Sequence, residues 1–105
     1  MKVVIYARVS TGEQDADNQI AQLNSWSRSR GWEIAGIYRE NESAWKNGHQ
    51  RELARLLDDA RKRRFDAVLV WALDRLSREG PLAILTLVNR LKNCGVKVVS
   101  YQESW

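Results

Sequence analysis

The chain has 105 residues, which is enough for one compact domain with its own core and too few to expect two. Hydrophobic residues make up 44% of the chain and charged residues 29%, a globular balance that excludes a disordered or fibrous protein. No apolar run is long enough to span a membrane, the N-terminal residues lack the apolar stretch of a signal peptide, and the net charge is +4. We therefore expect a soluble, intracellular protein with no membrane partner, one that attracts polyanions.

The first half of the chain alternates between strand and helix patterns. Residues 3–7 form a run rich in β-branched side chains that is too short for a helix, so they are predicted as a buried strand ending at Arg8. A helix follows a polar loop, because apolar residues recur at helical spacing and Gly31 supplies the expected stop. Residues 32–38 are predicted as the second strand, and the polar stretch 39–48, which has no periodicity, as a mobile loop.

The second half repeats this alternation. Apolar residues at i, i+3, i+4 and i+7 predict a helix over 53–60, closed by the basic run 61–64. That run either complements the helix dipole on a solvated face, which we favour, or contacts phosphate. Residues 67–71 are predicted as the third buried strand, a third helix opens at Pro81, and residues 96–100 form the fourth strand.

Strands that alternate with helices at this spacing predict an α/β fold. We expect a doubly wound three-layer sandwich with flavodoxin-like topology and a mostly parallel sheet of four or five strands. Chemistry in such folds takes place at the carboxyl ends of the strands, near the point where strand order reverses. If the first and third strands are neighbours, as in the common doubly wound order, the segments 8–14 and 73–78 converge at one edge.

The polar residues of these two segments suit phosphoryl transfer. Arg8 and Ser10 project to the same side of an extended backbone, so a guanidinium and a hydroxyl leave the sheet edge together. Arg75 and Arg78 share a face if their segment is helical. Guanidinium groups bind phosphate oxygens bidentately and stabilise charge as it develops. In the alternative interpretation Ser10 caps the first helix or a turn, and the two arginines form surface ion pairs with Asp74 or Glu79.

Other chemistries have little support in the sequence. The only histidine, His49, lies in a polar stretch and no G-x-S-x-G elbow is present, which argues against a Ser-His-Asp triad. The sequence contains no Walker loop, dinucleotide fingerprint or metal-spaced Cys/His set, so we expect no nucleotide, no metal and no other cofactor. Cys94 is expected to be structural, and Trp26, Trp32 and Trp71 are expected to pack rather than to stack on bases.

Two segments carry a resemblance to a known protein family. Residues 6–11 read YARVST and are followed by Gln14 and by the sequence DNQ at 17–19, and this arrangement resembles the N-terminal signature of the serine recombinases, the resolvase/invertase family. Residues 73–78 read LDRLSR and resemble the D-R-L-x-R segment that follows the third strand in that family. The resemblance covers nearly the whole chain. It implies a resolvase-like catalytic domain over residues 1–105, without the family's long dimerisation helix and DNA-binding domain.

The resemblance also implies a mechanism. Ser10 would attack the scissile phosphodiester, form a 5′-phosphoserine linkage to DNA and release a 3′-hydroxyl. Three arginines would hold the phosphate, two glutamines would add polar contacts, and one aspartate would orient an arginine. In this sequence these residues are Arg8, Arg75, Arg78, Gln14, Gln19 and Asp74. Exchange of one phosphodiester for another conserves bond energy, so no ATP is needed, and the arginines can supply the electrostatic stabilisation without a metal.

The chain departs from the family pattern before its second predicted helix. Family members usually carry an active-site arginine there, in a pattern like R-P-x-L, and alignment on Leu53 puts Gln50 at that place. Either Arg51 or Lys46 supplies the missing charge after a local shift, or the site is impaired.

The resemblance implies DNA as the partner. The intact protein would form dimers, and tetramers at synapsis, and would be cytoplasmic and associated with the nucleoid. The isolated chain is expected to bind DNA weakly and to be unable to complete recombination. The main alternative function is a non-catalytic interaction or regulatory module derived from a recombinase. A response-regulator-like phosphoacceptor domain would need an acidic cluster after the first strand, which this sequence lacks.

Overall fold

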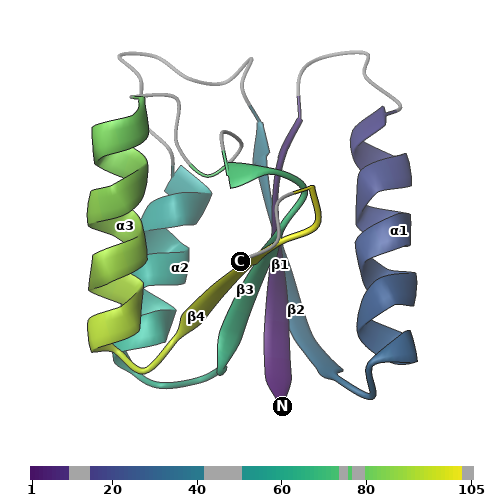
Figure 1. Cartoon of the computed structure of the whole chain (residues 1–105), viewed down its shortest axis with the longest axis horizontal. Helices are drawn as coiled ribbons and strands as arrows, with labels where there is room; N and C mark the ends of the chain where they lie inside the picture. The colour runs from purple at the N-terminus through teal and green to yellow at the C-terminus, as the bar shows by residue number, and fades with distance from the viewer. Residues whose placement is uncertain (10–14, 42–50, 74–75, 77–79, 103–105) are drawn as a thin grey trace.

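A computed structural model describes residues 1–9, 15–41, 51–73, 76 and 80–102. Strands alternate with helices along the chain (Figure 1), as the sequence predicts. The elements in chain order are β1 (Lys2–Val9), α1 (Asp15–Ser29), β2 (Glu33–Asn41), α2 (Arg51–Arg61), β3 (Ala67–Val70), α3 (Pro81–Asn93) and β4 (Lys97–Ser100).

The described strands form one parallel sheet in the order β2-β1-β3-β4. The pairing of β1 with β3, for example Ile5 opposite Leu69, confirms that the first and third strands are neighbours. The chain builds the sheet outwards from β1 in both directions, so the carboxyl ends of β1 and β3 lie at the point where strand order reverses. The carboxyl ends of these two strands, each followed in the sequence by a polar segment, are therefore adjacent.

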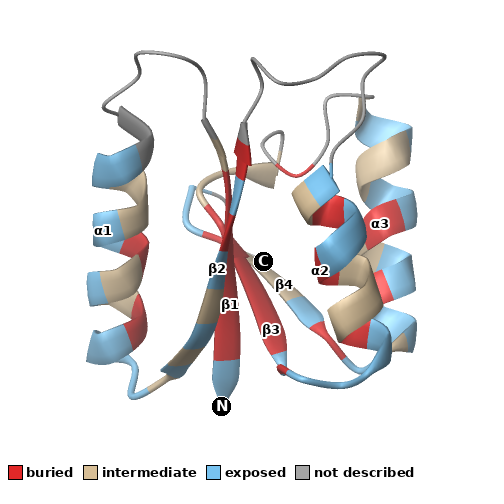
Figure 2. Ribbon diagram, turned by 180° about the vertical axis from the view of Figure 1, so that it is seen from behind, coloured by how far each residue is buried: buried red, intermediate tan, exposed pale blue. Residues whose placement is uncertain are grey.

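The sheet separates two apolar cores. Helix α1 covers one face, and α2 and α3 cover the other (Figures 1 and 2), which confirms the doubly wound three-layer arrangement. Alternate residues of β1 point to opposite faces. Val3 and Ile5 belong to the core under α1, whereas Val4 and Tyr6 belong to the core under α2 and α3. Both cores are continuous with β3, which is buried along its whole length.

Strand β2 is longer than the sequence suggests. The polar residues 39–41 were expected to begin a mobile loop, and this expectation is wrong: β2 continues to Asn41. The reason is the parallel pairing with β1, in which Arg39, Glu40 and Asn41 lie opposite residues 7–9. The ladder with β1 extends the strand beyond its apolar part, a tertiary effect that local composition cannot reveal. The rest of the predicted loop, residues 42–48, lies outside the described residues.

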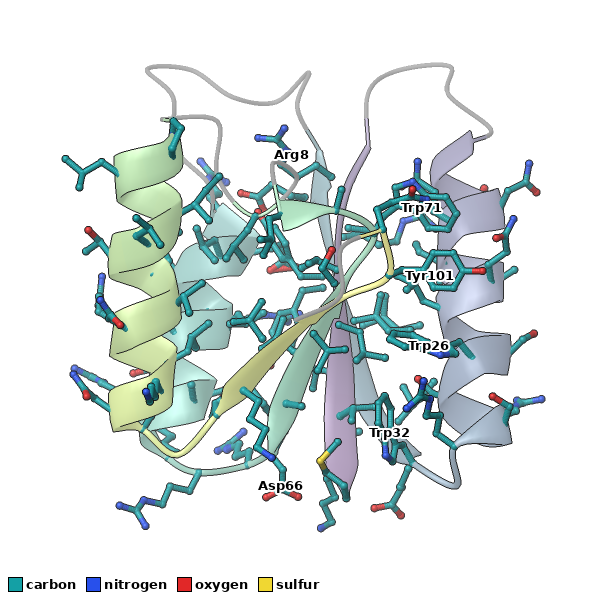
Figure 3. The ribbon with its side chains drawn as sticks, viewed as in Figure 1. Arg8, Trp26, Trp32, Asp66, Trp71 and Tyr101 are labelled. Carbon is teal, nitrogen blue, oxygen red and sulfur yellow. The ribbon has the colours of Figure 1, made fainter. Side chains whose placement is uncertain are left out.

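Aromatic side chains fill the space between α1 and the sheet (Figure 3). Trp71 stacks on Tyr101 with ring centroids 4.9 Å apart, and Trp26 meets the rings of Tyr101 and Trp32 edge-on at 5.4 and 5.6 Å. The three tryptophans are half-buried in the core under α1, which confirms their predicted packing role. Cys94 is partly buried and packs against the other core. No helix among the described ranges is long and apolar enough to cross a membrane.

Candidate active site at the carboxyl edge of the sheet

Arg8 is the second-last residue of β1 and lies at the carboxyl end of the sheet (Figure 3). The alternation of β1 puts its side chain on the same face as Val4 and Tyr6, beneath α2 and α3. Its Nε and Nη1 atoms are shielded from solvent. A guanidinium stays protonated in proteins, so β1 holds a positive charge inside this edge of the sheet. The structure thus places Arg8 at the edge where the sequence predicts the site.

Glu40 is a buried carboxylate at the same edge of the sheet, and the sequence reasoning did not single it out. It lies opposite Arg8 in the pairing of β1 with β2 and is only 1% exposed. Its Oε2 accepts the backbone N–H of Glu52, in the first turn of α2, at 2.6 Å. A carboxylate is favourable at a helix N-terminus because the first N–H groups lack intrahelical partners. The one available signal was that Glu40 follows Tyr38, a core residue, by two positions and so faces the same side of β2.

Arg51 and Gln19, two further predicted residues, lie on helices that begin at this edge. Arg51 is exposed and opens α2, directly before the residue whose N–H bonds to Glu40. Gln19 is half-buried in α1. An exposed ion pair between Asp17 and Arg39, with 2.7 Å between Oδ1 and Nη1, joins the start of α1 to the end of β2. Both helix N-termini therefore flank the carboxyl ends of β1 and β2.

Leu76 anchors the segment that follows β3. It is completely buried in the core under α2 and α3, and its N–H donates to the carbonyl of Leu73 at 3.0 Å. This contact places Leu76 one turn after Leu73, which follows the carboxyl end of β3 beside β1. The remaining predicted residues lie outside the described ranges, as does Gln50. They are Ser10, Gln14, Lys46, Asp74, Arg75 and Arg78.

The comparisons with known proteins agree with this architecture. The family model "Resolvase, N terminal domain" matches residues 3–104. The chain belongs to the resolvase family. The Transposon Tn552 DNA-invertase BinR of Staphylococcus aureus is 36% identical over 99 residues, which cover 94% of this chain and 46% of the relative. A resolvase of Clostridium perfringens is 31% identical over 103 residues, 98% of this chain and 50% of the relative. This resolvase-family chain thus spans about half the length of the curated relatives it matches.

Solved structures show the same fold. The N-terminal catalytic domain of TP901-1 integrase superposes with a TM-score of 0.85 at 33% identity, covering 99% of the resolvase-family chain and 79% of the integrase chain. The C-terminal catalytic domain of ISC1926 TnpA, an IS607-like serine recombinase, superposes with a TM-score of 0.83 at 26% identity, covering 95% and 67% of the two chains. Both are catalytic domains. The family and the fold class predicted from the sequence are therefore confirmed.

Proposed function

We propose that this chain is the catalytic domain of a site-specific DNA recombinase, with Ser10 as the nucleophile. The observation that carries the proposal is the position of Arg8: a guanidinium with two nitrogens shielded from solvent, at the carboxyl end of β1 and two residues before Ser10. The neighbouring strand β3 leads into residues 73–78, which contain two more arginines. A hydroxyl among several guanidinium groups suits attack on a phosphodiester.

In the proposed reaction the Ser10 oxygen forms a bond to phosphorus and loses its proton. The bond from phosphorus to the 3′ oxygen breaks, and that oxygen leaves with a proton as a 3′-hydroxyl. Arg8, Arg75 and Arg78 would stabilise the negative charge that grows on the phosphate oxygens. Rejoining reverses these steps with another 3′-hydroxyl. The number of phosphodiester-type bonds is unchanged, so the exchange requires no ATP.

Several roles around the nucleophile follow from the same proposal. Gln14 and Gln19 would add polar contacts to the phosphate, and Asp74 would orient an arginine. Arg51 is one candidate for the positive charge that Gln50 does not supply. It is the first residue of α2, directly before Glu52, whose N–H donates to Glu40. Lys46 is the second candidate for that charge.

DNA is the proposed partner, and the intact protein would act as a dimer that forms tetramers at synapsis. The relatives are called an invertase, a resolvase and an integrase, so the proposal includes no single outcome of strand exchange. We expect the protein to work in the cytoplasm on the nucleoid. We expect the chain without a further DNA-binding domain to bind DNA weakly and not to complete recombination.

The decisive experiment uses this domain fused to a DNA-binding domain and a nicked suicide substrate that traps the covalent intermediate. We expect wild type to form a protein–DNA adduct and Ser10→Ala to form none. Arg8→Gln should strongly reduce the yield of adduct, because one guanidinium that would stabilise the negative charge of the phosphate is lost. Added EDTA should leave the yield unchanged, whereas a metal-dependent nuclease would lose activity. Absence of an adduct with wild type would favour a non-catalytic module derived from a recombinase.

A further inference from the structure

The amino ends of the strands form a strongly basic surface at the end of the molecule opposite the candidate active site. We define the amino-terminal pole as residues 1–2, 26–33, 58–66 and 90–97, which comprise the last helical turns, the turns after them and the first strand residues. This end lies at the bottom of Figure 1. The pole carries ten Lys and Arg against four Asp and Glu, a net charge of +6, so the rest of the chain carries −2 of the total of +4.

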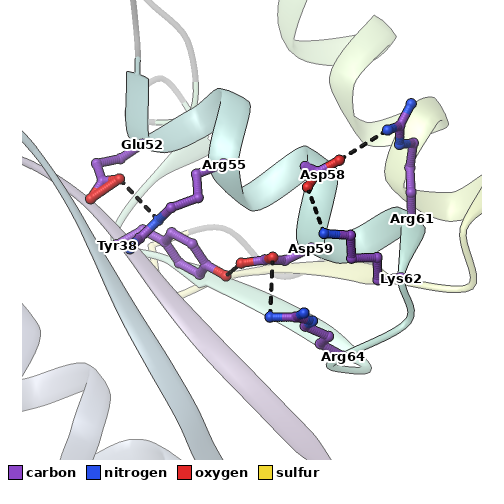
Figure 4. A network of polar contacts seen from close by, with 8 residues as sticks. All are labelled: Tyr38, Glu52, Arg55, Asp58, Asp59, Arg61, Lys62 and Arg64. Carbon is purple, nitrogen blue, oxygen red and sulfur yellow. Dashed lines mark hydrogen bonds and ion pairs between the residues drawn. The ribbon is translucent and has the colours of Figure 1, made fainter.

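Two aspartates of the pole, Asp58 and Asp59, form ion pairs with three of its cations. Asp58 accepts from both Arg61 and Lys62, at 2.9 and 3.1 Å (Figure 4), and these two hydrogen bonds lower its pKa. Asp59 pairs with Arg64 at 3.7 Å. All four cations of the run 61–64 stay exposed to solvent beside these pairs.

Most cations of the pole have no acidic partner among the described residues. Seven of the ten form no ion pair with any residue in the part of the chain that the structure describes, and all seven are exposed. They are Lys2, Arg28, Arg30, Arg63, Arg90, Lys92 and Lys97. The guanidinium of Arg30 lies over the rings of Trp26 and Trp32, 5.2 and 5.7 Å from their centroids. The helix dipoles account for only part of this charge, since each helix C-terminus presents about half a negative charge and three helices end here.

After α2, an arginine occupies a position with positive φ, a conformation that glycine adopts more readily. Helices α1 and α3 end on Gly31 and Gly95, with φ of 74° and 78°, and each following N–H bonds back to the carbonyl five residues earlier at 2.9 Å. Helix α2 closes with the same pattern, but the residue in this conformation is Arg63, with φ of 54°. A side chain is rarely found there because its Cβ crowds the backbone. The arginine keeps four successive cations, 61–64, unbroken.

We propose that the amino-terminal pole binds the phosphate backbone of duplex DNA without sequence specificity, as a DNA contact separate from the candidate active site. Duplex DNA carries one charge per about 1.7 Å of its axis, so a face bounded by the 24 Å extent of the molecule spans about fourteen phosphate charges. Six of the ten cations of the pole are arginines, whose planar fork matches phosphate oxygens. The inference goes beyond the proposed recombinase activity and holds whether or not Ser10 is the nucleophile.

The test measures binding of the 105-residue chain to a labelled duplex of arbitrary sequence as salt is varied. The double variant Lys92→Gln with Lys97→Gln should bind about 60-fold more weakly near 0.1 M salt, and its slope of log K against log salt should fall by about 2. The control, Gln22→Glu with Ser25→Glu, makes the same change in net charge on exposed positions of α1 outside the pole. It should retain the wild-type slope.

Arg63→Gly supplies a second test with opposite effects on folding and binding. Glycine adopts the conformation at this position freely, so the melting temperature should stay the same or rise. DNA binding should nevertheless weaken by about eightfold near 0.1 M salt, with a slope lower by about 1. A loss of binding therefore cannot be attributed to misfolding.

Two outcomes would overturn the inference. In the first, the pole variants bind DNA with the same affinity and salt slope as the α1 control. In the second, they abolish self-association of the chain in sedimentation without DNA and leave DNA binding unchanged, which would make the pole a protein interface. Loss of the covalent adduct in Ser10→Ala with duplex binding intact concerns only the recombinase proposal, so the two hypotheses can fail separately.

Discussion

Glu40→Ala tests whether the buried carboxylate at the end of β2 fastens α2 to the sheet. Glu40 is 1% exposed, and its Oε2 accepts the Glu52 N–H at 2.6 Å. A hydrogen bond to a charged group contributes about 1.5–3 kcal/mol, and a partly buried carboxylate at a helix N-terminus up to about 2 kcal/mol. The two contributions overlap, because both include the attraction between the carboxylate and the same N–H group, and they are therefore not fully additive. We expect the free energy of unfolding to fall by about 2–4 kcal/mol. Domains of this size have only about 5–15 kcal/mol in total.

Glu40→Gln separates the charge from the hydrogen bond. The glutamine amide oxygen can still accept from Glu52, and the side chain has nearly the same volume, so we expect a smaller loss of about 1–2 kcal/mol. The matched control is Glu33→Gln, at the other end of β2. Glu33 is exposed and its side chain makes no hydrogen bond or ion pair with the described residues, so its substitution should change stability by less than about 0.5 kcal/mol.

Urea unfolding measures these differences, and hydrogen exchange at the Glu52 amide reports on the contact itself. In Glu40→Ala that amide should exchange faster under conditions where the protein as a whole stays folded. The reasoning fails if Glu40→Ala is within about 0.5 kcal/mol of wild type, or if the Glu52 amide keeps its wild-type exchange rate. A melting-temperature shift of roughly 4–8 °C per kcal/mol offers an independent check.

Three further substitutions test other contacts. Leu76→Ala removes a completely buried side chain and should cost about 2–5 kcal/mol in urea unfolding; a loss below about 1 kcal/mol would contradict its anchoring role. Burial and the hydrogen bond to Asp59 raise the pKa of Tyr38, so its stabilising contribution is present below about pH 10 and is lost as pH rises further. The destabilisation by Tyr38→Phe, about 1–2 kcal/mol at neutral pH, should therefore shrink above pH 10, and a constant difference would refute this. A double-mutant cycle on the exposed Arg39 and Asp17 should give a coupling of only about 0.2–1 kcal/mol, reduced by salt; a larger, salt-independent value would contradict that expectation.

The fold class could be predicted because its signals are local. The apolar runs at 3–7 and 67–71 are too short for helices, and the stripe over 53–60 has helical spacing, so the order of elements could be inferred without any tertiary contact. The parallel direction of the strands could be inferred from this order, because helical crossovers join strands that run in the same direction. The position of Arg8 at the carboxyl end of a central strand, where such sheets place their chemistry, could also be predicted.

Tertiary structure alone decided the end of β2 and the part played by Glu40. Glu40 lies in a polar stretch two positions after Tyr38, and the local sequence there is typical of a loop. It is buried because β1 pairs with it on one side and α2 donates an N–H to it, both contacts with residues distant in the sequence. The amino-terminal pole has the same origin. Its cations come from four separate segments, and they meet because parallel strands with helical crossovers bring every helix C-terminus to the same end of the sheet.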